Sequence, residues 1–302
     1  MKVGFIGLGV MGGPMAANIV KGGHELTVYD LDAGAVQRLV QAGARAAASP
    51  QEVGAASEIV VTMLPLPQHV EQVLTGPGGV ADGLARGSLV IDMSTIDPRT
   101  SRRVASKLRE RGIAMIDSPV GKTSEHAVTG TLTLMVGGAP EDIARAKPVL
   151  DCMGNQTFLC GGQGAGHAMK MTNNLLATTI MCANTEALAI GVKEGLTLEL
   201  MVEVMKTTMG WNQQLATAMP KKAFVGDDSP GFMIKLAAKD VKLAVDAARQ
   251  MGFEPLVGAG AHATLDRAMA LGRGDRDTAA LLFLREQELG IEVRPGALKQ
   301  AA

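Results

Sequence analysis

The sequence predicts an α/β Rossmann domain with a mostly parallel, doubly wound sheet, followed by an all-α domain that a long helix joins to it. In the first half, short runs of β-forming residues alternate with segments of helical spacing. This alternation is typical of a parallel sheet covered by helices on both faces. Beyond Gly161 the strand signals disappear and only helical segments follow. We therefore expect one domain over residues 1–163 and a second over residues 164–302.

The elements of the first domain follow from short apolar runs. The predicted strands are Lys2–Ile6, Glu25–Tyr29, Ile59–Leu64, Leu89–Asp92, Met115–Asp117 and Thr131–Val136, and the predicted helices are Met15–Lys21 and Val36–Gln41.

In the second domain, the run 165–194 predicts one helix of roughly 30 residues, about 45 Å long. Gly195 is its expected stop, since glycine is common just past a helix end. Further helices are predicted at Leu198–Thr208, Ile234–Gln250 and Gly258–Leu271.

Composition narrows the classes of function. The 302 residues include 29 basic and 30 acidic side chains, so a net charge of -1 gives no reason to expect nucleic acid or an anionic membrane as partner. The three cysteines are odd in number and lack metal-ligand spacing, which favours free thiols in a reducing cytosol. No histidine pair has metal-binding spacing, so no metal site is expected.

Two further features favour a cytoplasmic protein. The N-terminal residues lack the apolar region and cleavage signal of a secretory peptide. The longest apolar run, Leu175–Ala183, is interrupted by Thr178 and Thr179, so we expect it to fall short of a membrane span.

A glycine-rich turn predicts a dinucleotide site. The G-x-G-x-x-G segment consists of Gly7, Leu8, Gly9, Val10, Met11 and Gly12, and it lies between a predicted strand and a predicted helix. In such a turn the first glycine permits the tight bend, the second lets the backbone approach a pyrophosphate, and the third permits close packing of helix on strand. The helix N-terminus then offers its N–H groups to the phosphates.

Asp30 indicates which dinucleotide binds. It lies 23 residues beyond Gly7, at the end of the second predicted strand, where a carboxylate accepts hydrogen bonds from the adenosine ribose and repels a 2′-phosphate. No arginine stands beside it, although Arg38 lies in the next predicted helix and could soften the preference. We expect NAD (NADH) as cofactor, with NADP disfavoured.

A lysine and an amide open the long helix. Lys170 and Asn174 are four residues apart, so they share one helix face. A lysine with a neighbouring amide, entered through Gly164 and Gly166, is a candidate proton donor beside a ligand. The alternative for Lys170 is an ordinary surface lysine.

These blocks together resemble the β-hydroxyacid dehydrogenases, the family of 3-hydroxyisobutyrate dehydrogenase. The resemblance extends over nearly the whole chain. It rests on the segments 7–12, 15–18, 63–65, 92–95, 117–120, 130–132, 164–174 and 239–240. It implies hydride transfer between a nicotinamide cofactor and a short acid carrying an alcohol, in a homodimer or homotetramer.

The resemblance also implies residue roles. Lys170 would be catalytic. Leu64, Pro65, Thr95 and Lys239 would lie near the cofactor. Ser118 and the segment Gly121–Ser124, together with Asn174, would surround the anionic end of a small substrate. Domain 1–163 would then bind NAD, and domain 164–302 would serve substrate binding and oligomerisation.

One loop departs from the common family pattern of Ser-Gly-Gly. Gly121 stands in place of the serine, and Lys122 and Thr123 stand in place of the glycines, with Ser124 following. A cation and two hydroxyls offer more donors than a carboxylate requires, which suits an anion with three acceptor oxygens. The loop resembles the sulfolactaldehyde reductase branch of the family, except that lysine replaces the expected arginine. A solvated loop charge is the alternative for Lys122.

Other functions remain open at this point. Succinate, tartronate and methylmalonate semialdehydes are alternative substrates. A non-catalytic NAD(P)-binding recognition module is the alternative from another class, and an imine reductase is a second enzyme alternative. The presence of Lys170 disfavours both of these.

Overall fold

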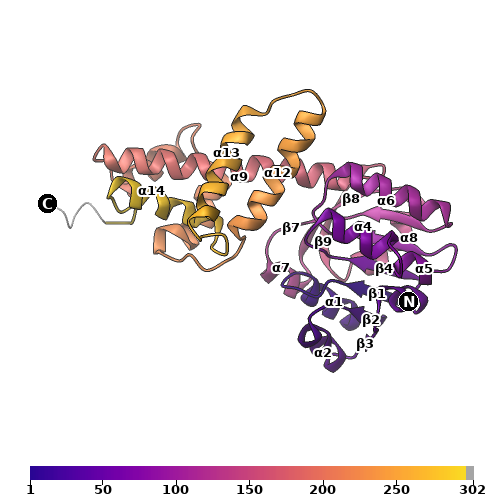
Figure 1. The fold of residues 1–302 in the computed structure, drawn as a ribbon. Coiled ribbons are helices and arrows are strands. Elements are labelled where there is room, and N and C mark those ends of the chain that lie inside the picture. The colour runs from indigo at the N-terminus through magenta and orange to yellow at the C-terminus, as the bar shows by residue number, and fades with distance from the viewer. Residues whose placement is uncertain (297–302) are drawn as a thin grey trace. The chain divides into compact units, whose positions relative to one another are not determined.

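The computed structural model describes residues 1–296, and the chain divides into two compact units, Met1–Met171 and Thr172–Ala302 (Figure 1). The last six residues of the predicted domain 164–302 lie outside the described residues. The helix α9 (Ala165–Lys193) begins in the first unit and continues into the second.

The first unit contains a nine-stranded sheet whose order is β3-β2-β1-β4-β5-β6-β8-β7, with β9 paired to β8. Strands β1 to β6 pair in parallel, whereas β8 runs antiparallel to β6 and β7. The strands are β1 (Lys2–Ile6), β2 (Glu25–Tyr29), β3 (Arg45–Ala46), β4 (Ile59–Thr62), β5 (Leu89–Asp92), β6 (Ala114–Asp117), β7 (Val120–Gly121), β8 (Leu132–Gly137) and β9 (Gly154–Gly161). The predicted mostly parallel sheet is confirmed.

Helices cover both faces of this sheet because alternate strand residues face opposite ways. Phe5 and Ile91 belong to one core, with side chains of α1, α2 and α8, whereas Val60 and Val90 belong to a second core with α3, α4 and α6. The helices are α1 (Gly12–Lys21), α2 (Ala33–Gln41), α3 (Pro50–Ala55), α4 (Pro67–Thr75), α5 (Val80–Gly83), α6 (Pro98–Glu110), α7 (Ser124–Thr129) and α8 (Pro140–Leu150). Two cores on one sheet are the mark of a doubly wound fold.

The second unit is helical, as predicted. After α9 come α10 (Leu198–Lys206), a π-helical turn (Gln214–Ala218), α11 (Met219–Lys221), a short 3₁₀ turn (Ala223–Val225), α12 (Ile234–Gln250), α13 (Leu256–Ala270), a second 3₁₀ turn (Thr278–Ala280) and α14 (Leu281–Leu289). Between residues 172 and 296 the only β pairing is an isolated bridge from Met233 to Asp277.

Helix α9 ends close to Gly195, the residue that the sequence predicts as its stop. Gly195 has φ +90°, its N–H donates to the Val192 carbonyl, and the Leu196 N–H donates to the Gly191 carbonyl. These two bonds form a Schellman motif.

The same helix is long and apolar enough, by length and composition, to cross a membrane, and half of its apolar window is buried inside the protein. The expectation that its apolar run falls short of a span was therefore too strict. Buried helices of soluble proteins have the same length and composition.

Candidate active site

The glycine loop joins β1 to α1, and its glycines meet different surroundings. A Cβ atom on Gly12 would overlap the Gly7 carbonyl oxygen, so the fold itself requires glycine there. A Cβ atom on Gly9 would meet no atom within 4 Å. Packing within the chain therefore does not require glycine at position 9, and the open space there would let a ligand approach the backbone closely.

Asp30 follows β2 and holds this loop. Its Oδ2 atom accepts a 2.6 Å hydrogen bond from the Leu8 N–H, and its Oδ1 atom accepts a 2.8 Å bond from the Asp32 N–H. A carboxylate has about four acceptor positions, so these two bonds leave capacity for hydroxyl donors.

A cleft of about 580 Å³ opens beside these residues. Its lining combines the glycine loop, the end of β2 and the start of α2, and consists of Leu8, Gly9, Val10, Gly13, Pro14, Ala17, Asp30, Asp32, Ala35, Arg38, Leu39 and Ala42. Helix α1 receives no side-chain cap from Met11, so its first N–H groups suit an anion. These features fit the adenosine and phosphate portions of NAD.

Asp92 lies at the end of β5 and connects two loops by hydrogen bonds: the loop that follows β5 and the loop that follows β4. Its Oδ1 atom accepts hydrogen bonds from Thr62 Oγ1 at 2.8 Å and Ser94 Oγ at 2.6 Å, and Ser94 Oγ accepts one from the Leu64 N–H at 2.9 Å. The half-buried Leu64, the exposed Pro65 and the half-buried Thr95 lie in these loops. Both loops follow the carboxyl ends of parallel strands, where ligands bind in doubly wound sheets.

Asp117, at the end of β6, fixes the start of α9. Its two oxygens accept hydrogen bonds from the Gly164 N–H at 2.6 Å and the His167 N–H at 2.8 Å. A carboxylate at this position complements the positive end of the helix dipole. Burial raises the pKa of Asp117, although the His167 charge and these two bonds oppose the rise. Lys170 follows within the next turn and is half-buried.

The imidazole of His167 lies between two carboxylates, and all three side chains are fully buried. Nε2 lies 3.1 Å from the Ser94 carbonyl oxygen and 3.5 Å from Asp92 Oδ2, while Nδ1 lies 3.7 Å from Asp117 Oδ2. Sequence reasoning missed this cluster. The signal was available, because Asp92 and Asp117 each end a predicted apolar strand in which a buried charge needs a partner.

The loop after β7 has an unusual backbone at Lys122. Its φ of +75° is the one positive value at a non-glycine position within residues 1–296. Lys122 Nζ donates a 2.7 Å hydrogen bond to the Thr131 carbonyl, and the exposed Thr123 has its Oγ1 atom 3.0 Å from His126 Nδ1. Lys122 thus keeps the left-handed backbone that favours glycine, the residue of the common family pattern.

The other predicted substrate residues of this segment differ in exposure. Gly121 is half-buried at the end of β7 and pairs with Thr133, and Ser124 is half-buried at the start of α7. Ser118 is fully buried, and its Oγ atom has no hydrogen-bond partner among the described residues.

In the second unit, Asp240 joins two predicted site residues. Asn174 Nδ2 donates a 2.6 Å hydrogen bond to Asp240 Oδ2, and Lys239 Nζ forms a 2.9 Å ion pair with Asp240 Oδ1. The exposed fractions of Asn174 and Asp240 are 6% and 4%. Sequence reasoning placed Asp240 beside Lys239 but did not foresee its bond to Asn174, which lies 66 residues earlier in the chain.

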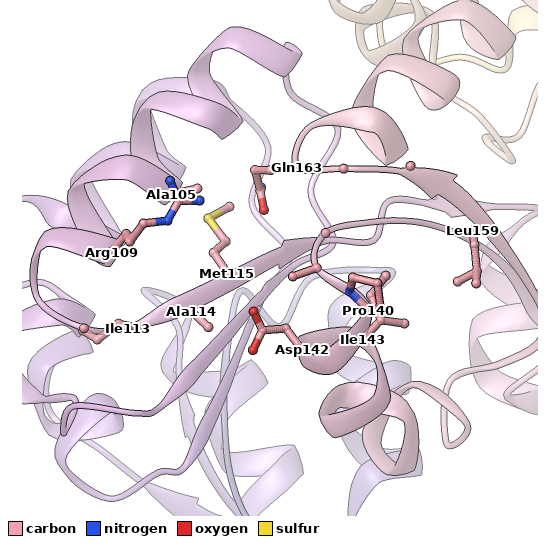
Figure 2. Close-up of a pocket in the computed structure, with 15 residues that line it drawn as sticks. Ala105, Arg109, Ile113, Ala114, Met115, Pro140, Asp142, Ile143, Leu159 and Gln163 are labelled. Atoms are coloured by element: carbon pink, nitrogen blue, oxygen red, sulfur yellow. The ribbon is translucent and has the colours of Figure 1, made fainter.

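A larger cavity, about 910 Å³, lies elsewhere in the first unit (Figure 2). It is lined by the end of α6, the start of α8 and the end of β9, and Arg109 and Asp142 are its charged side chains. None of the predicted site residues lines it. Volume alone does not make this cavity the candidate active site. The predicted site residues of the first unit lie mostly in the loops after β1, β2, β4, β5, β6 and β7, with Lys170 on α9.

Two family models together match nearly the whole chain. Residues 2–162 match the family model described as the NAD binding domain of 6-phosphogluconate dehydrogenase, and residues 164–284 match the one described as NAD-binding of NADP-dependent 3-hydroxyisobutyrate dehydrogenase. The chain is 40% identical to the 3-sulfolactaldehyde reductase of Escherichia coli, covering 93% of this chain and 94% of that one. It is 39% identical to the NAD-dependent L-serine dehydrogenase of Pseudomonas aeruginosa, covering 96% and 99%.

Solved structures show the same fold over most of the chain. The 3-hydroxyisobutyrate dehydrogenase of Mycobacterium tuberculosis, solved with L-serine, superposes with a TM-score of 0.87 at 31% identity, covering 93% of this chain and 98% of that one. An imine reductase of Myxococcus stipitatus, at 20% identity and a TM-score of 0.63, shares the fold. The chain belongs to the 3-hydroxyisobutyrate dehydrogenase family and is an NAD-dependent β-hydroxyacid dehydrogenase.

Proposed function

We propose that this enzyme reduces 3-sulfolactaldehyde to dihydroxypropanesulfonate with NADH. Sequence similarity alone does not select this substrate. Relatives of nearly equal sequence identity are named as dehydrogenases of L-serine and of 3-hydroxyisobutyrate. The observation that carries the proposal is the loop from Gly121 to Ser124, where a cation and two hydroxyls replace a pattern suited to a carboxylate.

Lys122 and the two hydroxyls of Thr123 and Ser124 form the anion site in this proposal. The Lys122 ammonium carries three donors, and its bond to the Thr131 carbonyl uses one of them. The others can bind sulfonate oxygens. A lysine contributes a point charge rather than a bidentate fork, so substrate selection depends on charge and hydroxyl donors together. Gly121 and Ser118 shape the backbone of the same segment.

Lys170 is the general acid in the proposed reaction. NADH, when bound, would supply the hydride that the aldehyde carbon accepts. The Lys170 ammonium donates a proton to the carbonyl oxygen, which gives the alcohol. In the reverse direction the neutral amine takes that proton back. Asn174 positions the reacting oxygen or the lysine.

The proposed cofactor residues of domain 1–163 are the segment Gly7–Gly12 with Asp30, followed by Leu64, Pro65 and Thr95. Lys239 of domain 164–302 is a further proposed cofactor residue. Asp30 makes NAD preferred over NADP. The enzyme acts in the cytoplasm as a homodimer or homotetramer, with a small anionic substrate as its partner.

The test is a steady-state comparison of substrates with NADH. We expect kcat/KM to be highest for 3-sulfolactaldehyde among a panel that includes succinate, tartronate and methylmalonate semialdehydes. Lys122→Gly should lower kcat/KM for the sulfonate by about 10- to 100-fold, the worth of a charged hydrogen bond. Because glycine adopts φ +75° without strain, this variant should fold at least as stably as the wild type.

Two outcomes contradict the proposal. One is equal kcat/KM on carboxylate semialdehydes with none on the sulfonate. The other is a Lys122→Gly variant whose kcat/KM on the sulfonate matches the wild type. Lys21→Ala, on the last turn of α1, is the matched control for loss of an exposed lysine.

A further inference from the structure

We propose that His167 and Asp117 share one proton at neutral pH, and that the buried set Asp92, His167 and Asp117 is the device that positions Lys170. The positioning part rests on the proposed function of Lys170. The shared proton does not.

The first step concerns Nε2 of His167. It lies 3.1 Å from the Ser94 carbonyl oxygen, and a carbonyl oxygen only accepts hydrogen bonds. Nε2 must therefore carry a proton. Asp92 Oδ2, 3.5 Å away and without a hydrogen bond among the described residues, adds negative charge on the same side of the ring.

The second step concerns Nδ1. It lies 3.7 Å from Asp117 Oδ2 and makes no hydrogen bond within the described residues. A neutral ring with its proton on Nε2 would turn the Nδ1 lone pair toward an ionised carboxylate, with both groups fully buried. Such an arrangement is costly because no water compensates either group. One proton between Nδ1 and Asp117 removes the conflict, as imidazolium with carboxylate or as imidazole with carboxylic acid.

The charged and titratable groups around the pair come from β5, β6, β9 and α6. Asp92 faces the ring from β5 and Asp117 faces it from β6. Burial raises the pKa of the Cys160 thiol in β9, and the nearby negative charge of Asp117 raises it further. Arg102 of α6 binds the Gln163 carbonyl through Nε at 3.1 Å. Burial likewise raises the pKa of Asp117, which favours a proton on the pair.

The set reaches Lys170 through the first turn of α9. Asp117 accepts the backbone N–H groups of Gly164 and His167, so the carboxylate that shares the proton also fixes the helix start. Lys170 is three residues beyond His167, on the same side of the helix. Without the proton, repulsion between the ring and the carboxylate would loosen this turn and move the lysine.

Imidazole ¹⁵N NMR on the full-length protein without ligands, at pH 7, tests the shared proton. The His167 ring is assigned by backbone-to-ring correlation, and His262 of α13, paired with Asp266, serves as reference. We expect two N–H nitrogens, or one N–H nitrogen together with a protonated Asp117 carboxyl in ¹³C spectra. A single N–H on Nε2 beside an ionised Asp117 would overturn the inference.

His167→Gln tests the positioning role, with His262→Gln as control. Glutamine can keep the donor to the Ser94 carbonyl but lacks the second donor toward Asp117. We expect kcat to fall on the order of tenfold, as for a small misplacement of a reacting group, with the NADH dissociation constant unchanged. An unchanged kcat, or an equal loss in NADH affinity, would overturn the positioning role. If the wild type reduces no aldehyde tested, the proposed function fails while the NMR result stands by itself.

Discussion

The side-chain amide of Asn174 donates a 2.6 Å hydrogen bond to the Asp240 carboxylate in the buried interior of the second unit. This bond fixes which way the amide points, so that Asn174 Oδ1 faces away from Asp240 and accepts a 3.2 Å bond from Asn173. Asp240 also pairs with Lys239. One carboxylate thus orders two predicted site residues.

Substituting Asn174 tests this arrangement. Asn174→Asp should lower the melting temperature more than Asn174→Ala, because it places a second carboxylate against Asp240 in a buried site. We expect a cost of about 1–3 kcal/mol for Asn174→Ala, since the charged Asp240 loses a partner. Differential scanning calorimetry of both variants checks the order. Equal melting temperatures for the two variants would contradict it.

The glycine loop offers a matched pair of substitutions. Gly12→Ala should destabilise the fold by about 1–3 kcal/mol because its Cβ atom overlaps the Gly7 carbonyl oxygen. Gly9→Ala should leave the melting temperature unchanged but weaken NADH binding about tenfold, equivalent to ~1.4 kcal/mol, because its methyl group occupies ligand space. Calorimetry and NADH titration separate the two effects. A Gly9→Ala variant with wild-type NADH affinity would contradict the cofactor placement.

Asp30 and Asp32 line the same cleft and provide a second comparison. Asp30→Asn should lower NADH affinity by about tenfold, as expected when a charged hydrogen bond worth ~1.5 kcal/mol is lost, and should narrow the preference over NADPH. Asp32→Asn keeps the cap on the Gly34 N–H, since asparagine is an equally good N-cap, and should change affinity little. Fluorescence titration with both cofactors measures this. Equal losses of NADH affinity in the two variants would contradict a specific role of Asp30 in cofactor binding.

The lowered pKa of Glu71 leads us to expect that the free energy of unfolding falls in acid. Hydrogen bonds from Arg103 and Lys107 lower the pKa of Glu71 from 4.5 to about 2. The folded state therefore binds this proton less tightly than the unfolded state, so the stabilisation is present above pH 4.5 and is lost as pH falls toward 2. Glu71 and its two partners are near the surface, so we expect the lost stabilisation to be less than about 1 kcal/mol.

Urea unfolding of wild type and Glu71→Gln at pH 6 and at pH 3 measures this difference, with Glu110→Gln on α6 as control. The stability gap between wild type and Glu71→Gln should shrink at the lower pH. A difference in unfolding free energy that is larger at pH 3 than at pH 6 would contradict a lowered pKa for Glu71.

Strong apolar patterns made most of the fold predictable. Strands such as Leu89–Asp92 are continuous buried runs, and their predicted bounds are confirmed. Strand β9 was missed because most of its residues are exposed along the sheet edge, leaving no buried pattern to detect. Helix α6 was missed because three of its six buried residues, Pro98, Thr100 and Ser101, are not typical core residues, and six of its other seven positions are charged. Spacing along a chain reveals local elements but not which exposed edge receives a strand.

The strand–turn–helix pattern singled out both the glycine loop and Asp30 as site candidates. It did not predict that the Leu8 N–H donates a hydrogen bond to Asp30, 22 residues later in the chain. Nor did it predict the partners of His167, because Asp92 and Asp117 come from strands 75 and 50 residues earlier and meet it only when the sheet is assembled.

The most direct test of the account is Lys170→Ala, assayed for kcat with NADH and 3-sulfolactaldehyde, alongside the NADH dissociation constant. Loss of a general acid should lower kcat by about 10²- to 10⁴-fold while NADH affinity stays at the wild-type value. A variant with near wild-type kcat would contradict the assignment of Lys170 as the proton donor.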